Sequence, residues 1–306
     1  MRILITGARG MLGTDACRYF AGIGHEVVGV DLVIADAAGG QDPAGVSFLP
    51  LDITDPKSVR GTLASVKPDL VLHCAAYTNV DGCERDPDMA YKINAFGTWS
   101  IASATEAVGA ALVALSTDFV FGGHKSSPYT EFDQPGPLGH YASSKLAGER
   151  LAMRHCSRTY VVRTAWLFGV NGNNFPYAIL RRAREKGEVS VVTDQYGTPT
   201  FTQDLVRAID AIVREPLYGI YHASNDGATT WFEYAHAVLT RAGLGSTPVH
   251  PITPDEYAVN FNSPTKRPAY SVLRNWSMEL RGLPPMRPWQ EALDDFVAES
   301  KAAGKI

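Results

Sequence analysis

The first half of the chain alternates short apolar runs with stretches of helical periodicity. Residues 2–6 form the first predicted strand, and a glycine-rich turn and an apolar-periodic stretch to about residue 22 follow it. Further strands are predicted at 26–30, 47–50, 70–74, 111–116 and 159–164. Helical stretches between them are predicted near 56–66, 88–107 and 141–155. Buried strands that alternate with helices are typical of βαβ units, so the pattern predicts an α/β fold with a Rossmann-like, doubly wound parallel sheet.

The pattern changes after about residue 165. Asn171-Gly172-Asn173-Asn174 predicts a loop, and prolines recur between residues 248 and 288. We therefore expect residues 1–165 to form a Rossmann core, with later elements at about 189–222 returning to it. Residues 166–306 should then form mainly a smaller C-terminal lobe.

Composition and charge narrow the class of protein. The chain has 306 residues, 45% of them hydrophobic, and a net charge of −4 without a basic block, so we expect no nucleic-acid partner. The four cysteines form no CxxC motif, and no apolar run is long enough for a signal segment or a membrane span. We expect a cytoplasmic protein without a membrane partner. The eight histidines show no metal-ligand spacing, so no metal site is predicted.

Three glycines between the first strand and the first helix point to a nucleotide. Gly7, Gly10 and Gly13 are spaced G-x-x-G-x-x-G, which suits a tight turn and a close approach of the backbone to phosphate. A diphosphate at this place would meet backbone N–H groups and the positive end of the helix. The motif alone also fits an ordinary glycine-rich turn, and its position between strand and helix favours a dinucleotide site.

Two nearby groups give opposite indications of the cofactor. Asp31, at the end of the second strand, could accept hydrogen bonds from the adenosine ribose and would favour NADH. Arg9 could pair with a 2′-phosphate and would favour NADPH, so both cofactors stay open. Asp52 and Ile53 could cover the adenine, although Asp52 could instead cap the helix that begins near Pro56.

A second motif carries candidate chemistry. Tyr141 and Lys145 form Y-x-x-x-K, which on a helix places both side chains on one face. A nearby ammonium would lower the pKa of the phenol, as acid–base work at a carbonyl requires. Thr117 ends a predicted strand and could bind the reacting oxygen. The Tyr–Lys pair by itself fits an exposed helix pair, but the order of glycine loop, threonine and Tyr–Lys pair indicates hydride transfer to or from a carbonyl.

Motifs spread over nearly the whole chain resemble the extended short-chain dehydrogenase/reductase superfamily, and within it reductases of dTDP-linked 4-keto-6-deoxysugars. The similar stretches lie at residues 6–13, 75–81, 94–98, 116–121, 141–145, 163–166, 173–175, 194–200 and 267–271. The resemblance implies that NADPH or NADH reduces the C4 ketone of dTDP-4-dehydro-L-rhamnose to dTDP-L-rhamnose, in nucleotide-sugar and polysaccharide biosynthesis.

The resemblance also implies roles for individual residues. Tyr141 would protonate the developing alkoxide, Lys145 would lower its pKa and hold the nicotinamide ribose, and Thr117 would orient the ketone. The other implied contacts with the cofactor come from Met11 and Leu12 in the loop and from Ala75 and Ala76. The substrate pocket of the C-terminal lobe and core would include Thr78, Val80, Asp118, Trp166, Asn174 and Arg267, of which Asn174 and Arg267 would lie near the diphosphate.

Some departures and alternatives remain. Met11 stands where glutamine is common, Ala142 where glycine is common, and Gly82-Cys83 where Lys-Ala is common. A dehydratase would need a carboxylate pair after Thr117, but Phe119 follows Asp118. A non-catalytic dinucleotide-binding regulatory subunit, or a reductase or epimerase of another nucleotide-linked 4-keto sugar, remains an alternative. A homodimer is possible, but no acidic cluster for a shared magnesium ion can be placed.

Overall fold

Seven parallel strands form the centre of the molecule. The computed structural model describes residues 1–33 and 45–306. The strands of the sheet are β1 (Arg2–Thr6), β2 (Glu26–Asp31), β3 (Val46–Pro50), β4 (Leu70–His73), β5 (Ala111–Thr117), β6 (Thr159–Thr164) and β11 (Gly219–His222). Their order is β11-β6-β5-β4-β1-β2-β3, so the direction of winding reverses between β1 and β4. Ligands of such sheets bind at the carboxyl ends of the strands beside this reversal.

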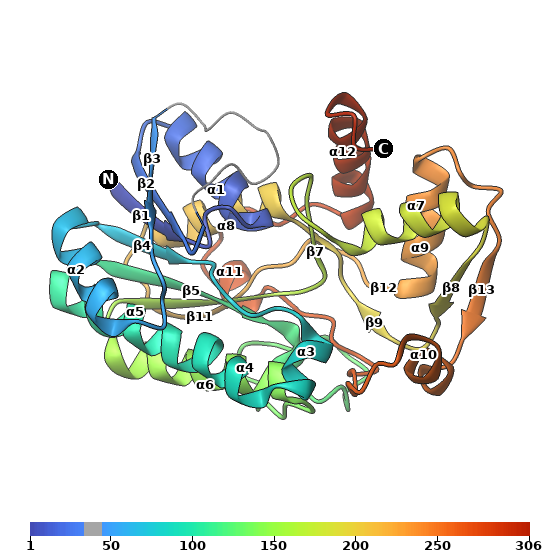
Figure 1. The fold of residues 1–306 in the computed structure, drawn as a ribbon, viewed down its shortest axis with the longest axis horizontal. Helices are drawn as coiled ribbons and strands as arrows, with labels where there is room; N and C mark the ends of the chain where they lie inside the picture. The colour runs from blue at the N-terminus through green and yellow to red at the C-terminus, as the bar shows by residue number, and fades with distance from the viewer. Residues whose placement is uncertain (34–44) are drawn as a thin grey trace.

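Helices cover both faces of the sheet (Figure 1). One face carries α1 (Met11–Gly22) and α8 (Thr202–Val213), and the other carries α2 (Pro56–Val66), α5 (Thr98–Val108) and α6 (His140–His155). Side chains of β1 alternate between the two cores: Ile3 and Ile5 pack with α1 and α8, whereas Leu4 packs with α2 and α5. This two-sided burial explains why the strands are continuous apolar runs.

Short helices connect the larger elements near the carboxyl edge. They are α3 (Val80–Arg85), α4 (Pro87–Tyr91), the π-helical turn η1 (Lys92–Gly97) and the 3₁₀ turn η2 (Asp118–Val120). The single helical stretch expected near 88–107 is therefore divided into α4, η1 and α5. The predicted strands and the other helices are confirmed within one or two residues.

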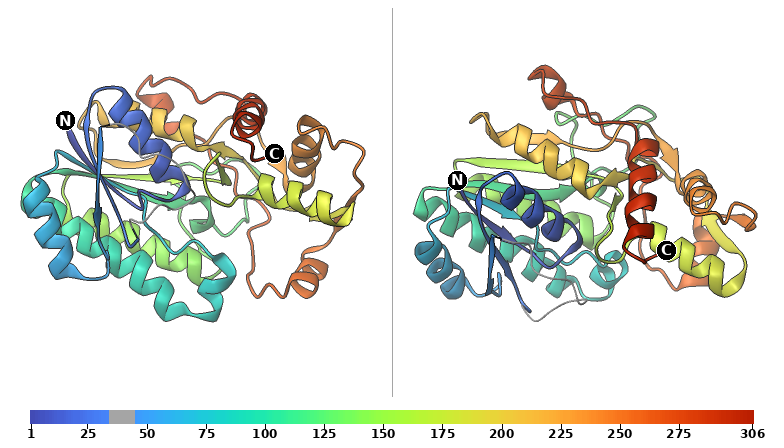
Figure 2. Two further views of the ribbon diagram at one scale, coloured as in Figure 1. Left: turned by 45° about the horizontal axis from the view of Figure 1, so that its top comes forward. Right: turned by 90° about the horizontal axis from the view of Figure 1, so that it is seen from above.

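A smaller lobe lies beside the sheet and has its own core (Figures 1 and 2). Its main elements are α7 (Phe175–Lys186), β8 (Val189–Val192), α9 (Trp231–Arg241), β13 (Val249–Ile252), α10 (Pro254–Phe261) and α12 (Trp289–Ala302). Aromatic side chains including Phe168, Phe201, Tyr234 and Phe296 are buried together there. The short strands β7 (Leu167–Phe168), β9 (Tyr196–Gly197), β10 (Thr200–Phe201) and β12 (Thr229–Thr230) complete the C-terminal half, whereas α11 (Trp276–Leu280) packs beside β11 of the central sheet.

The chain passes between the two parts more than once. After α7, β8 pairs with β13 in the smaller lobe, and the chain then returns to the sheet through α8 and β11. The division at residue 165 stays a prediction, while the predicted Rossmann-like α/β class is confirmed. None of the helices in residues 1–33 and 45–306 has the length and apolar character needed to cross a membrane.

Candidate active site

A pocket of about 990 Å³ opens at the carboxyl edge of the sheet. Its size is at the upper end for small-molecule and cofactor sites. The predicted site residues in its wall are Gly7, Gly10, Met11, Leu12, Gly13, Asp31, Asp52, Ile53, Ala75, Ala76, Thr78, Thr117, Asp118, Tyr141, Lys145 and Trp166. The structure thus brings most of the predicted residues together, but Arg9, Val80, Asn174 and Arg267 are not part of this wall.

The glycine loop has a conformation that only small residues permit. Gly7 has a φ of 66°, and a side chain there would approach the backbone nitrogen of Ala75 to 2.8 Å. A side chain at Gly13 would overlap the carbonyl oxygen of Gly7. No side chain among the described residues caps the N-terminus of α1 at Gly10. The backbone N–H groups of this end are therefore directed to the pocket, where an anion would satisfy them.

The two groups that favour different cofactors are joined to each other. The carboxylate of Asp31 accepts hydrogen bonds from the backbone N–H of Arg9 (3.0 Å) and of Leu32 (2.8 Å). The guanidinium of Arg9 lies 3.8 Å from the centre of the Phe48 ring. Asp31 and Arg9 thus lie next to each other, and their positions favour neither NADH nor NADPH over the other.

The alternative interpretation of Asp52 as a helix cap is wrong. The cap of α2 is Asp55, whose carboxylate accepts from the N–H of Lys57 at 3.0 Å. Asp52 instead closes a local turn by accepting two hydrogen bonds from Thr54, each 2.8 Å long. Asp52 and the buried Ile53 remain in the pocket wall, where they were expected to cover an adenine.

Buried polar side chains fix the loop that follows β4. The His73 ring lies 2.7 Å from the Thr6 hydroxyl and 3.1 Å from the Thr98 hydroxyl, and Thr6 accepts from the N–H of Ala75. Burial lowers the pKa of His73 to about 3, with a further contribution from the charge of Lys145, so the ring is neutral. This contact sets the position of Ala75 against Gly7.

Asn94 holds the next part of the same loop. Its amide accepts from the N–H of Tyr77 (2.8 Å) and donates to the carbonyl of Tyr77 and to the Ser144 hydroxyl, both at 3.1 Å. Ser144 precedes Lys145 on α6. Asn94 therefore ties the pocket loop to the helix that carries the candidate chemistry, a role that the sequence motif did not disclose.

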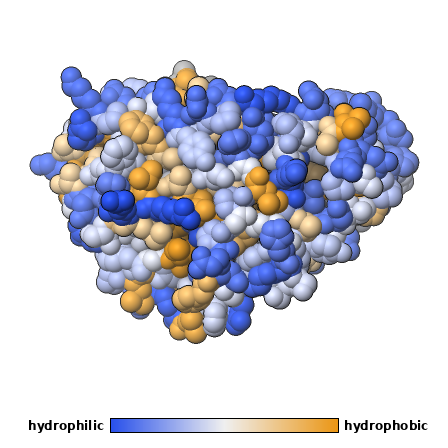
Figure 3. Space-filling model, turned by 90° about the horizontal axis from the view of Figure 1, so that it is seen from below, coloured by the Kyte–Doolittle hydropathy of each residue, from blue (hydrophilic) through white to orange (hydrophobic). Residues whose placement is uncertain are grey.

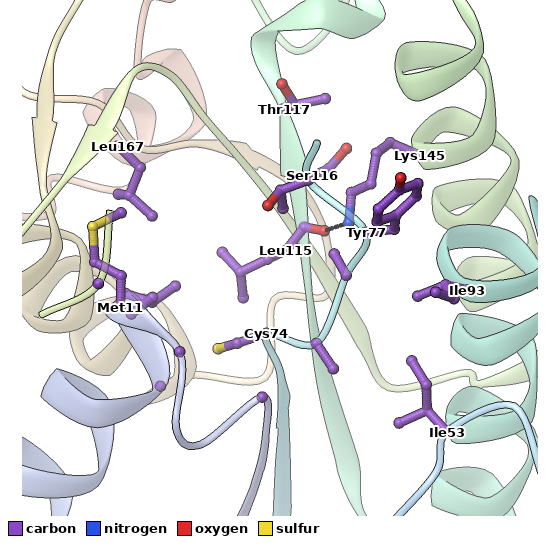
Figure 4. Close-up of a pocket in the computed structure, with 18 of the residues that line it drawn as sticks. Met11, Ile53, Cys74, Tyr77, Ile93, Leu115, Ser116, Thr117, Lys145 and Leu167 are labelled. Carbon is purple, nitrogen blue, oxygen red and sulfur yellow. Dashed lines mark hydrogen bonds between the residues drawn. The ribbon is translucent and has the colours of Figure 1, made fainter. Parts of the chain in front are cut away.

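Tyr141 and Lys145 lie one turn apart on α6, as predicted. The Lys145 ammonium reaches the end of β5 and donates to the carbonyl of Leu115 at 2.7 Å (Figure 4). Burial lowers the pKa of Lys145 to about 8, against an opposing effect of Glu149. With this pKa, most Lys145 side chains carry the proton at pH 7 and lose it as the pH rises through about 8.

The pKa of Tyr141 departs from the sequence-based expectation. Burial raises it above its usual value, the charge of Asp118 acts in the same direction, and a hydrogen bond with Thr117 acts in the opposite one. The Lys145 ammonium, which donates to the carbonyl of Leu115, is not among the groups that shift this pKa, so a lowering of the Tyr141 pKa by Lys145 stays a prediction. A protonated phenol at neutral pH is the form that can donate to a developing alkoxide.

Thr117 and Asp118 form a polar pair beside the phenol. The Thr117 hydroxyl donates to Asp118 at 3.1 Å and accepts from the N–H of Phe119 at 3.2 Å, which begins η2. Burial raises the pKa of Asp118 to about 7, although hydroxyls of Ser271 and Thr117 oppose the shift. Thr117 and Asp118 are thus buried beside the half-buried Tyr141.

Trp166 has an uncommon backbone conformation. Its φ is 43°, which is rare and costly for a bulky residue and is often found at functional sites. Its ring stacks on Trp231, with the ring centres 3.5 Å apart. Trp166 lines the pocket, and Trp231 packs against its ring outside the pocket wall. Trp231, which was not among the predicted site residues, therefore supports Trp166 in the site.

Arg267 is held by α3 rather than by the pocket. Its guanidinium donates to Ser263 (2.9 Å) and lies 3.4 Å from Asp81, which also accepts from Ser263 and Thr265 at 2.7 Å. Partial burial alone would raise the pKa of Asp81, but the two hydroxyls and the Arg267 charge outweigh it and lower the pKa. Asp81 follows Val80, so this cluster joins the predicted sugar-binding segment to residues 263–267.

The pocket wall also contains residues that were not predicted, among them Tyr77, Lys92 and Asn173. Lys92 begins the π-helical turn η1, a type of distortion that is frequent at functional sites, and Tyr77 and Asn173 come from loops. The composition of the loops around Tyr77 and Asn173 could have indicated them, but nothing local marks Lys92. Within the described residues, no group of three or more histidine, cysteine, aspartate or glutamate side chains could hold a metal ion.

Comparison with known proteins identifies the family of the chain. The sequence matches the family described as the RmlD substrate binding domain over residues 1–302. The chain belongs to this family. A spore coat polysaccharide biosynthesis protein, SpsK of Bacillus subtilis, is 37% identical over 302 residues, which cover 99% of each chain.

Solved structures of family members agree with the fold. The dTDP-4-dehydrorhamnose reductase of Clostridium acetobutylicum has a TM-score of 0.88 at 39% identity, covering 98% of this chain and 100% of that chain. The dTDP-4-dehydrorhamnose reductase of Bacillus anthracis, in complex with NADP, has a TM-score of 0.84 at 36% identity, covering 98% and 99%. The predicted resemblance is confirmed.

Proposed function

We propose that the chain reduces the C4 ketone of dTDP-4-dehydro-L-rhamnose to dTDP-L-rhamnose with NADPH or NADH. The observation that carries the proposal is the convergence of Thr117, Tyr141 and Lys145 on one pocket, whose other end is the glycine loop. Related proteins named dTDP-4-dehydrorhamnose reductases, one of them solved with NADP, support this reaction and cofactor class.

The glycine loop and the loop after β4 are suited to a nicotinamide dinucleotide. Gly7 and Gly13 allow close approach, the N-terminus of α1 would hold the diphosphate, and Asp31 would bind the adenosine ribose. When bound, the dihydronicotinamide supplies the hydride that is added to C4.

Residues of the chain would supply the proton that the carbonyl oxygen needs. Reduction of a ketone needs one proton at the carbonyl oxygen, and the Tyr141 phenol, protonated at neutral pH, would donate it. Thr117, hydrogen-bonded to Asp118, would fix the oxygen beside the phenol. Lys145 would hold the ribose and stabilise the phenolate that remains after the transfer. The buried setting strengthens each of these interactions.

The sugar nucleotide would lie between the two lobes. Thr78 and Trp166 line the pocket there, and Val80 begins the helix that carries Asp81. Trp166, supported by Trp231, would provide an apolar wall for the deoxysugar. Asn174 and Arg267 would contact the diphosphate, although both side chains already have protein partners.

The test is the loss of absorbance at 340 nm with dTDP-4-dehydro-L-rhamnose, run with NADPH and with NADH. Turnover with dTDP-L-rhamnose as product would support the proposal, and the ratio of the two rates would show whether Arg9 or Asp31 dominates. Tight cofactor binding without turnover would contradict it and favour a regulatory subunit. Turnover of only another nucleotide-linked 4-keto sugar would contradict the substrate assignment.

Two further expectations belong to the proposal, a cytoplasmic location and a homodimer. The underside of the molecule carries apolar patches among hydrophilic residues (Figure 3). Large apolar side chains are exposed on three neighbouring elements: Phe96 on η1 (37% exposed), Trp99 on α5 (39%) and Met153 on α6 (40%). Light scattering would distinguish a dimer from a monomer of 33.1 kDa, and cell fractionation would test the location.

A further inference from the structure

Residues 169–174, between β7 and α7, cross the glycine loop at Met11. A side chain at Gly169 would lie 3.2 Å from Met11 Cγ, and one at Gly172 would lie 3.3 Å from Met11 Cβ. The Asn174 amide lies 3.7 Å from the Met11 sulfur. Gly172 and Asn173 also line the pocket beside the glycine loop. A segment from the second lobe therefore forms part of the wall at the place where a diphosphate would bind.

The segment is attached to α1 through a buried carboxylate. Asp15, one turn after Met11 and 6% exposed, accepts from the Asn171 amide at 3.0 Å and from the Thr202 hydroxyl at the start of α8. Both hydrogen-bond donors are neutral; burial raises the pKa of Asp15, and the two hydrogen bonds and the charges of Arg18 and Lys305 oppose the shift. Burying a carboxylate costs free energy that its hydrogen bonds must offset, so these two bonds fix Asp15 against Asn171 and Thr202.

Independent contacts hold the neighbouring residues of the segment. The carbonyl of Val170 accepts from the Lys305 ammonium at 2.7 Å and from the Tyr177 hydroxyl at 3.1 Å. The carbonyl of Gly169 accepts from Asn174 at 2.7 Å, and the same side chain caps α7 by accepting from the N–H of Tyr177. The position of Asn174 thus depends on the attachment of the whole segment.

We propose that Asp15 and Asn171 are positioning residues that hold residues 169–174 over the glycine loop, enclose the dinucleotide diphosphate, and link its binding to that of the sugar nucleotide through Asn174. The first part needs only a dinucleotide ligand, whereas the link to the sugar nucleotide rests on the proposed function. Coupling of this kind is reciprocal, so each ligand should raise the affinity for the other by the same factor.

The first experiment measures NADPH binding by fluorescence titration. Asn171→Ala removes one hydrogen bond, and a bond of this kind contributes about 0.5–1.5 kcal/mol, so the Kd should rise roughly two- to tenfold. Lys305→Ala should weaken binding in the same direction. The matched controls are Asn260→Ala on the exposed face of α10 and Lys301→Ala, whose ammonium contacts Arg241 instead of the segment.

Thermal unfolding distinguishes a local role from a folding defect. We expect Asn171→Ala to unfold only a few degrees below the wild type, because one hydrogen bond is lost, and to bind NADPH more weakly at a temperature where it is fully folded. A wild-type Kd for NADPH in Asn171→Ala and Lys305→Ala would overturn the first part of the proposal. Equal weakening in the control variants would overturn it as well, because the effect would not be specific to the segment.

The second experiment uses dTDP as the probe, titrated with and without saturating NADPH. We expect NADPH to raise the affinity of the wild type for dTDP several-fold, and Asn171→Ala to reduce this factor toward one. An affinity that is independent of NADPH in the wild type would overturn the link. Neither titration needs turnover, so a wild type that shows this coupling without reductase activity would contradict the proposed function and leave the positioning role intact.

Discussion

Two regions of the molecule shift the pKa values of their polar groups in opposite directions relative to the charged form. They are the carboxyl edge of the sheet and the contact between α3 and residues 263–267. At the edge, Lys145 and Asp118 are buried and Tyr141 is half-buried, and burial shifts the pKa of each in the direction that favours its neutral form. In the second region, Asp81 and Arg267 face each other while partly exposed, and the pKa of Asp81 is lowered.

This difference in environment matches the two roles proposed for the regions, proton transfer at the edge of the sheet and substrate binding at α3. The groups that would act at the reacting oxygen lie on β5, η2 and α6, where a low dielectric makes their protonation states sensitive to a ligand. Groups that would contact the charged part of a substrate already have partners in the protein. A ligand must compete with Asp81 for Arg267, so binding there exchanges one ion pair for another and yields a modest net gain.

The largest effect should come from Tyr141→Phe. Loss of the donated proton should lower kcat about 10²–10⁴-fold and leave NADPH affinity nearly unchanged, because the phenol acts in the transfer step. Steady-state kinetics and NADPH titration measure the two effects. Tyr19→Phe, which removes a hydroxyl bound to Asp210 on α8, is the control and should retain wild-type kcat. Near-normal turnover in Tyr141→Phe would contradict the role of Tyr141 as proton donor, and with it the assignment of proton transfer to the edge of the sheet.

Lys145 should set an alkaline limit for cofactor use. Its pKa is about 8, so kcat/KM for NADPH should fall above that pH, by up to about tenfold per unit, as the ammonium loses its proton. A pH profile of wild type and Lys145→Arg tests this, because the guanidinium stays charged. The same alkaline limb in both proteins would assign the limit to another group.

Asp118 should make the protein less stable as the pH rises. Its pKa is 3.8 in the unfolded chain and about 7 in the folded one, so folding favours the protonated form. The stability that is present below pH 3.8 is lost as the pH rises toward 7, by up to about 1.4 kcal/mol per unit. Asp118→Asn should therefore gain stability relative to the wild type over this range in urea unfolding.

Asp133→Asn provides a control of opposite sign. Burial acts to raise the pKa of Asp133, but Lys125 and Thr130 outweigh it and lower the pKa, so this carboxylate stabilises the fold at higher pH. Its neutralisation should cost stability at pH 7 and less at lower pH. A difference between Asp118→Asn and wild type that does not vary with pH would contradict the burial argument.

The smallest effect is expected for the ion pair of Asp81 and Arg267. A double-mutant cycle of Asp81→Asn and Arg267→Gln should give a coupling of about 0.2–1 kcal/mol in the free energy of unfolding, as for other partly exposed pairs. The KM for the nucleotide sugar should respond more strongly to Arg267→Gln than to Asp81→Asn. A coupling well above this range would show that the pair is structural and not available to a ligand.

The sequence by itself determined the local features of this protein. Apolar periodicity indicated the strands of the sheet and most of its helices, but not the division of residues 88–107 into α4, η1 and α5. The spacing of Gly7, Gly10 and Gly13 and of Tyr141 and Lys145 placed these residues correctly, because turns and helix faces depend on neighbours along the chain. The family motifs also indicated the threonine at the end of β5.

Only the tertiary structure decided the features that depend on distant residues and on burial. Asp81 contacts Ser263 and Arg267, which lie 182 and 186 positions later in the sequence. Asp15 contacts Asn171 and Thr202, which come from distant parts of the chain. The raised pKa of Tyr141 and the stacking of Trp166 on Trp231 likewise result from packing. Local spacing carries no information about desolvation or about contacts made by chain reversal, and both act through the folded environment.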